Sequence, residues 1–206
     1  MEKVDYKKIY RSIYKVSSKE PVLVIFPELK YIAVEGTGSP SSNQFSQSLQ
    51  ALYGIAYTIS MSDKNQDFQI PGFNKFVCPP LEGHWGVIDG MEYDGIDKSV
   101  FKWEIRILMP KFVTPEVLNK AITIISQKKD NPKFKSVNLI TRPSKRRCVM
   151  LHIGSFNKEP ETFKIMESFV QEKGLFRTSK NHEEIYLSDF RKVSEEKLKT
   201  ILAFEV

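Results

Sequence analysis

The sequence has few cysteines and no long hydrophobic run, and both shortages exclude classes of protein. Cys78 and Cys148 stand far apart, without the C-x-x-C spacing of a metal or redox site. The longest aliphatic stretch, residues 22–26, falls far short of the roughly 18 apolar residues of a membrane span. The opening residues lack the apolar core of a signal peptide. These absences predict a cytoplasmic protein with two reduced, partly buried thiols.

Familiar enzyme motifs are also missing. The chain has no G-x-S-x-G elbow, no phosphate-binding P-loop, no dinucleotide fingerprint and no H-E-x-x-H helix. Gly36-Thr37-Gly38 lacks a third glycine and predicts a turn. The 3 histidines are not clustered with other ligands, so the sequence predicts no metal site and no cofactor.

Positive charge is in excess, with 31 basic and 25 acidic residues and a net charge of +6. Clustered lysine and arginine can bind nucleic acid by releasing counterions from phosphate. The densest cluster consists of Arg142, Lys145, Arg146 and Arg147, with Lys128, Lys129, Lys133 and Lys135 before it. No groove-reading motif accompanies these residues. We therefore expect a solvated basic surface, and neither a nucleic acid nor a membrane as partner.

Hydrophobic periodicity predicts an α+β fold built from two similar halves. A helical extension is expected over 1–20, followed by a ligand-binding domain over 21–206 with halves at about 21–112 and 113–206. Helices are expected at 43–60, after Thr114, and from Pro160 to near Gly174. The expected strands are 22–26, 30–36, 76–82, 101–109, 137–142, 147–154, 184–187 and 201–206.

A repeat underlies this order of elements. A shift of 118 residues places Gly36 on Gly154 and Phe45 on Phe163. Each half then has the order strand, helix, strand, strand. We expect pseudo-twofold symmetry, with the helices on one sheet face and the other faces enclosing a ligand groove between the halves.

Alternation along two strands suggests which side chains are buried. In 101–109, apolar residues alternate with Lys102, Glu104 and Arg106, which predicts burial on one face only. In the segment around Glu184, Ile185 and Leu187 are expected to pack on the helices, leaving Glu184 and Tyr186 on the opposite face. A buried carboxylate there would serve as a general base or as the counter-charge of a cationic ligand, whereas an exposed strand glutamate is the alternative.

Two tryptophans and a histidine are further candidates. Trp85 lies between glycines, a setting in which the backbone can approach a ligand. Trp103 lies on the alternating strand, where filling the core is the simpler interpretation. His152 shares a strand face with Cys148 and Met150, which is typical of a buried, hydrogen-bonded histidine.

Several segments, in this order, resemble the GyrI-like small-molecule-binding family. They are residues 27–38, Pro80-Leu81-Glu82-Gly83-His84-Trp85, residues 106–114, Leu151-His152-Ile153-Gly154-Ser155-Phe156 and residues 182–189. The resemblance implies a tandem strand-helix-strand-strand fold around a ligand groove, with Glu184 as the family's buried acid. Glu183 departs from the family, where a second histidine is common, as does Gly86, where a second aromatic is common.

The resemblance implies three classes of function, because the family contains multidrug sensors, stand-alone drug-binding or gyrase-inhibiting proteins, and hydrolases of cyclopropane-bearing DNA-alkylating toxins. We expect no attached DNA-reading domain, and the toxin hydrolase is our leading hypothesis. A sequestering or sensing binder of hydrophobic aromatic molecules and a gyrase-inhibitor-like partner binder are the alternatives. The expected catalytic residues are Glu184 and Tyr186, and the expected ligand-binding residues are Trp85, Trp103, Tyr53, His152 and Phe156.

Overall fold

The computed structural model describes residues 3–189 and 192–206. The chain forms two units, each assembled from separated segments. Unit 1 consists of Met1–Tyr6, Leu29–Pro79 and Val87–Arg142, and unit 2 consists of Lys7–Glu28, Pro80–Gly86 and Pro143–Val206. Within the described residues, none of the helices is both long enough and apolar enough to cross a membrane.

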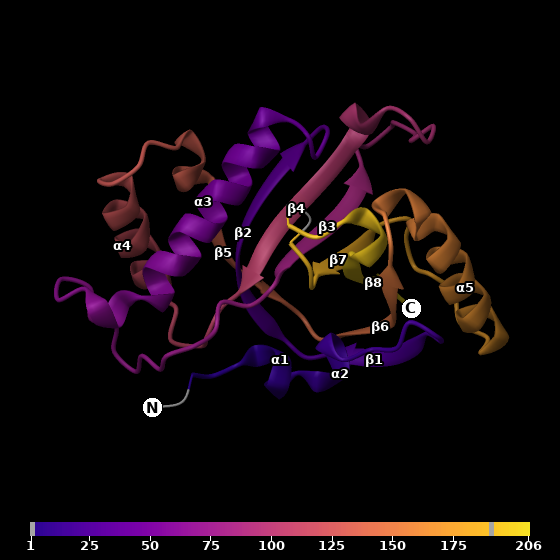
Figure 1. Cartoon of the computed structure of the whole chain (residues 1–206), viewed down its shortest axis with the longest axis horizontal. Helices are drawn as coiled ribbons and strands as arrows, with labels where there is room; N and C mark the ends of the chain where they lie inside the picture. The colour runs from indigo at the N-terminus through magenta and orange to yellow at the C-terminus, as the bar shows by residue number, and fades with distance from the viewer. Residues whose placement is uncertain (1–2, 190–191) are drawn as a thin grey trace. The chain divides into compact units, whose positions relative to one another are not determined.

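Unit 1 is a three-stranded antiparallel sheet with two helices. Strand β2 (Leu29–Thr37) pairs with β4 (Phe101–Leu108) on one side and with β5 (Asn138–Arg142) on the other. Helix α3 (Asn43–Ser60) runs along β2 and also packs on α4 (Pro115–Ser126) (Figure 1). Short 3₁₀ turns lie at Ser62–Lys64, Lys98–Val100 and Pro132–Ser136.

Side-chain caps explain where these helices begin. The hydroxyl of Ser42 accepts a hydrogen bond from the backbone N–H of Phe45, and that of Thr114 accepts one from Val117. Pro115 occupies the first turn of α4, where its missing N–H costs nothing. Both starts follow from local sequence, and the predicted bounds of the first helix, 43–60, are confirmed.

Unit 2 is a five-stranded antiparallel sheet in the order β1-β6-β8-β7-β3. The strands are β1 (Val22–Phe26), β3 (Leu81–Val87), β6 (Lys145–Ile153), β7 (His182–Tyr186) and β8 (Lys199–Glu205). Helix α5 (Glu159–Glu172) packs on β6 (Figure 1) and ends before Gly174, whose φ of 67° suits glycine. The short helix α1 (Tyr6–Ile9) begins at the last residue of the first segment of unit 1, and the short helix α2 (Arg11–Tyr14) belongs to unit 2. Short 3₁₀ turns lie at Phe156–Lys158 and Glu195–Lys197.

The α+β class and the repeated order of elements are confirmed. One half reads β2-α3-β3-β4 and the other β6-α5-β7-β8. Although β3 follows α3 in sequence, its residues 82–85 pair with β7, so most of this strand belongs to unit 2. The groove between the halves stays a prediction.

Two expected elements were wrong in their bounds. The strand expected at 76–82 begins only at Leu81, and Phe76 forms an isolated bridge with Val4. Pro79 and Pro80 precede the strand, and prolines cannot donate to a sheet ladder. The single helix expected in the N-terminal extension is interrupted at Tyr10 and forms the two short helices α1 and α2.

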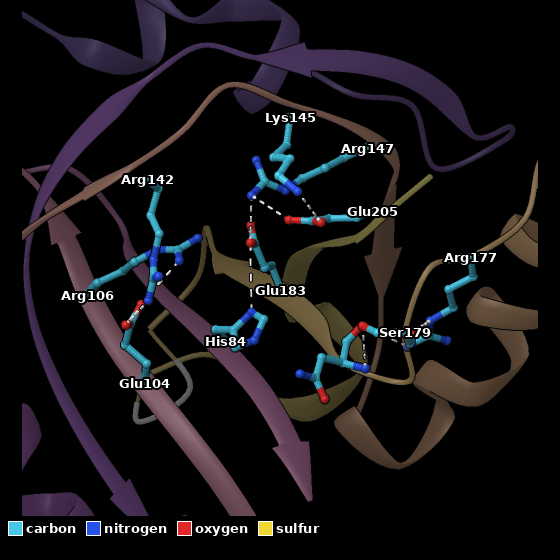
Figure 2. A network of polar contacts seen from close by, with 11 residues as sticks. His84, Glu104, Arg106, Arg142, Lys145, Arg147, Arg177, Ser179, Glu183 and Glu205 are labelled. Carbon is cyan, nitrogen blue, oxygen red and sulfur yellow. Dashed lines mark hydrogen bonds and ion pairs between the residues drawn. The ribbon is translucent and has the colours of Figure 1, made fainter.

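The expectation of one-sided burial on β4 was also wrong. Glu104 and Arg106 are 4% and 1% exposed. Arg106 Nη1 lies 3.2 Å from Glu104 Oε1, and Arg142 also pairs with Glu104 (Figure 2). The Arg106 guanidinium lies 4.7 Å from the centre of the Tyr31 ring. Alternation shows that these residues share a face, but only tertiary partners make burial of their charges tolerable.

Candidate functional site

The pairing of β3 with β7 brings the candidate residues of unit 2 onto one face. Gly83 lies opposite Glu184, and Trp85 lies opposite His182. Side chains of directly paired residues point to the same face of a sheet, and residues two apart on a strand share it. This face therefore carries Trp85, His182, Glu184 and Tyr186.

Glu184 is the buried carboxylate of this face, at 6% exposure. The Nε2 atom of His182 lies 2.9 Å from Glu184 Oε1. Tyr186 also forms a hydrogen bond with the Glu184 side chain. A buried carboxylate is tolerated where donors surround it in this way.

A second hydrogen bond joins the tryptophan to this group. The indole N–H of Trp85 donates to the hydroxyl oxygen of Tyr186 at 2.9 Å. Gly83 makes this contact possible, because a Cβ at this position would lie 2.5 Å from Trp85 Nε1 and 2.9 Å from the Tyr186 hydroxyl. The result is a chain of hydrogen bonds from Trp85 through Tyr186 to Glu184.

The environment keeps the Tyr186 phenol protonated. Burial raises the pKa of Tyr186 well above its usual value, and the charge of Glu184 and the hydrogen bond with Glu184 raise the pKa further. The charge of Glu159 acts in the same direction, while the hydrogen bond from Trp85 opposes it. Tyr186 is therefore a neutral hydrogen-bond donor at physiological pH.

Helix α5 contributes a second buried carboxylate that sequence reasoning missed. Glu159 is the first residue of α5 and is 7% exposed. One ligand atom from each of Glu159, His182 and Glu184 lies within 4.8 Å of the others. Two carboxylates and an imidazole are a set that can hold a divalent cation, although His182 and Glu184 are already hydrogen-bonded to each other. In sequence, Glu159 signals only an acidic first turn.

The structure places Glu184 and Tyr186 on the face opposite to the one expected. Glu184 pairs with Leu202, which shares a core with Met166 and Val170 of α5. The catalytic candidates therefore lie on the helix-bearing face, and Ile185 points to the other. The expectation failed because apolar residues of α5 pack on β6 and β8, while Glu159 at the start of the same helix lies beside Glu184.

The other expected residues of unit 2 have distinct settings. His152 is buried, with Nδ1 2.8 Å from Thr162 Oγ1 and Nε2 3.0 Å from the Ser155 carbonyl, as expected for a hydrogen-bonded core histidine. Phe156 is 36% exposed and meets Tyr186 edge to face, with ring centres 6.1 Å apart. Phe156 thus borders the Glu184 site, while both His152 nitrogens already have partners.

Trp103 and Tyr53 belong to unit 1. Trp103 is 1% exposed, packs edge to face on Phe45 at 5.0 Å, and donates its N–H to the Gly38 carbonyl at 3.2 Å. Tyr53 is partly buried and stacks with Tyr57 at 6.0 Å. Their part in ligand binding stays a prediction.

The opposite face of β7 carries an ion-pair network around Glu183 (Figure 2). Arg147 Nη2 lies 2.9 Å from Glu183 Oε1 and 3.7 Å from Glu205, and His84 Nδ1 lies 3.8 Å from Glu183. Lys145 pairs with Glu205 at 3.2 Å. Arg142, Lys145 and Arg147 of the basic cluster thus have carboxylate partners. This use of Glu183, which is 5% exposed, was not foreseen.

The chain is similar to known proteins in both sequence and structure. Residues 108–206 match the GyrI-like small molecule binding domain. An uncharacterised conserved protein of Listeria innocua is 34% identical, with a TM-score of 0.91 and coverage of 98% of each chain. Two structures described as a hydrolase from Listeria innocua are 33% identical, with TM-scores of 0.91 and 0.89. The first covers 99% of both chains, and the second covers 98% of this chain and 99% of its own.

More distant structures share the fold alone. The C-terminal domain of EcmrR is 12% identical, with a TM-score of 0.51 over 90% of this chain and 96% of that domain. Among curated proteins, none matches the chain significantly. Identity of about a third over nearly the whole of both chains, together with the domain match, shows that the chain belongs to the GyrI-like small-molecule-binding family.

Proposed function

We propose that this protein is a hydrolase that opens the cyclopropane ring of DNA-alkylating toxins and so protects the cell that makes it. The observation that carries the proposal is Glu184, a buried carboxylate held by His182 and Tyr186 on one face of unit 2. Similarity at 33% identity to a protein described as a hydrolase supports catalysis. The toxin class comes from the branch of the family that the sequence resembles.

The reaction adds one water molecule to the toxin. Glu184 takes a proton from water while the water oxygen attacks the ring methylene, forming a C–O bond. The strained C–C bond breaks, and its electron pair moves to the conjugated carbonyl oxygen. That oxygen takes up a proton equivalent to the one that Glu184 removed from water, so a hydroxyl group forms and Glu184 returns to its carboxylate. A positioned general base of this kind contributes roughly 10²- to 10⁴-fold to the rate.

Tyr186 is suited to the developing oxygen charge. Before reaction, its hydroxyl is engaged with charged Glu184. Once Glu184 has accepted a proton, the carboxyl is neutral and this hydrogen bond weakens. The phenol, whose pKa burial keeps raised, then has an O–H to donate to the oxygen of the opened ring.

Aromatic side chains beside Glu184 supply the contact surface for a flat toxin. Trp85 and Phe156 both contact Tyr186. Ring-to-ring contacts of this kind contribute about 0.5–1.5 kcal/mol each beyond simple burial. The same surface would also serve a protein that binds such a molecule without catalysis. This non-catalytic binder is the second candidate function, because the family is defined by small-molecule binding.

Turnover separates the two candidates. In an excess of a cyclopropane-bearing alkylator, a hydrolase produces ring-opened product far beyond one equivalent, whereas a binder protects only stoichiometrically. Glu184→Gln is expected to abolish turnover, while binding of a neutral aromatic ligand persists. Glu161→Gln, on the exposed surface of α5, is the matched control and should leave turnover unchanged. Stoichiometric protection by the wild type would contradict the hydrolase.

A further inference from the structure

Glu184 has two ionisable neighbours that the proposed chemistry does not use. His182 lies two residues before Glu184 on β7, and Glu159 begins α5. One ligand atom of each of the three residues lies within 4.8 Å of the others. Glu159 and Glu184 are both more than nine-tenths buried. Two buried carboxylates and one imidazole therefore share a small volume.

Aromatic packing sets the orientation of the His182 ring. Phe163 of α5 meets His182 edge to face, with ring centres 4.9 Å apart. Phe163 in turn packs against Phe204 at 6.4 Å and lies 5.2 Å from the Arg177 guanidinium carbon. The imidazole is thus restrained on one side by α5 while its Nε2 atom lies 2.9 Å from Glu184 Oε1.

The charges around His182 decide which way this hydrogen bond runs. An unprotonated nitrogen would direct a lone pair toward an ionised carboxylate, whereas an N–H can donate to it. Glu159 adds a second negative charge nearby and is itself favoured at the N-terminus of a 14-residue helix. A hydrogen bond from an N–H of His182 to the Glu184 carboxylate is therefore the arrangement that satisfies both side chains.

We propose that His182 and Glu159 are positioning residues of the Glu184 site. His182 donates its Nε2–H to one oxygen of Glu184 and fixes the plane of that carboxylate. Glu159 stabilises His182 in the donating state. The inference rests on the proposed hydrolase, since it assigns these residues to the reaction that Glu184 performs.

Substitution of His182 tests the positioning role. His182→Phe keeps a ring against Phe163 but removes both nitrogens. It is expected to lower kcat about a hundredfold, the effect of misplacing a reacting group by ~1 Å, with little change in KM. His182→Gln, whose amide N–H can still donate, should retain more activity. His84→Gln is the matched control, because His84 faces Glu183 on the other side of the strand pair.

The pattern of kcat and KM distinguishes positioning from structural support. A wild-type kcat in His182→Phe, or a change in KM alone, would overturn the role of His182. Glu159→Gln is expected to lower kcat about tenfold, a modest part of the loss that misplacing a reacting group can cause. Its control is Glu161→Gln. Equal kcat in the two glutamate variants would remove Glu159 from the proposal.

A measurement independent of activity separates this inference from the hydrolase itself. Because the chain has 3 histidines, imidazole ¹H–¹⁵N spectra with single variants assign His182 readily. The wild type should show a downfield, slowly exchanging Nε2–H signal for His182 that moves upfield in Glu184→Gln. A His182 proton on Nδ1 alone would overturn the inference. If the wild type shows this His182 signal but no turnover of the toxin, the hydrolase proposal is refuted, while the Glu184–His182 hydrogen bond is supported.

Discussion

Trp85 and Trp103 are the two tryptophans of the chain, and they differ in what their indole N–H contacts. Both are buried, at 7% and 1% exposure. Each lies against a glycine, since a Cβ on Gly83 would lie 2.5 Å from Trp85, and one on Gly36 would lie 2.4 Å from Trp103. Trp103 donates to a backbone carbonyl, whereas Trp85 donates to Tyr186.

The hydrogen-bond partner of the indole N–H distinguishes a structural tryptophan from a tryptophan in a polar site. A backbone carbonyl is a fixed acceptor, so the bond to Gly38 satisfies the Trp103 indole and stabilises the core of unit 1. The Tyr186 hydroxyl both accepts from Trp85 and bonds to Glu184, so its hydrogen bonds can rearrange when Glu184 gains a proton. Burial alone does not distinguish these two cases.

The largest expected effect comes from emptying the core position in unit 1. Trp103→Ala removes a ring that packs on Phe45 and is expected to lower the free energy of unfolding by about 3–5 kcal/mol. Urea unfolding followed by circular dichroism measures the loss. A decrease in the free energy of unfolding below ~1 kcal/mol would show that Trp103 is not a core residue. That result would favour the expected direct role of Trp103 in ligand binding.

Adding a methyl group beneath each tryptophan sharpens the comparison. Gly36→Ala and Gly83→Ala each introduce a clash and should cost about 1–3 kcal/mol of stability. Only Gly83→Ala should also impair turnover, because the added Cβ separates Trp85 from Tyr186. Equal turnover in the two folded variants would contradict a functional Trp85–Tyr186 contact.

A smaller effect is expected from removing the indole donor of Trp85. Trp85→Phe keeps an aromatic ring but leaves Tyr186 without this hydrogen bond, a loss of about 1 kcal/mol. Turnover should fall more than the affinity for a neutral aromatic ligand, since the ring that stacks is still present. Fluorescence and product formation, compared with the Trp103→Phe variant, measure these two quantities.

The smallest effect is a pH dependence that appears only in alkaline solution. Burial raises the pKa of Tyr186, so the folded state holds the phenolic proton above the unfolded-state pKa of about 10. Stability from this group is present below pH ~10 and is lost as pH rises further. Wild type and Tyr186→Phe should therefore unfold in parallel between about pH 7 and 9 and diverge above ~10. Parallel curves above that pH would contradict the raised pKa.

Local sequence predicted much of the secondary structure. Helix ends depend on only a few neighbouring residues, here the caps Ser42 and Thr114 and the terminating Gly174. These helix ends could therefore be predicted from the sequence. Cys78 is partly buried as expected, whereas Cys148 is fully buried, and burial raises the pKa of both thiols to about 12. Alternation correctly placed Glu184 and Tyr186 together on one face of β7.

Tertiary structure decided which face that was and what surrounds it. Glu159 reaches Glu184 only because α5 folds onto the sheet of unit 2. Arg147 and Glu183 are 36 positions apart in sequence, and nothing in either segment indicates that one neutralises the other. Periodicity and capping are short-range properties encoded in neighbouring residues. The partners of buried charges depend on long-range contacts, so they became visible only in the folded chain.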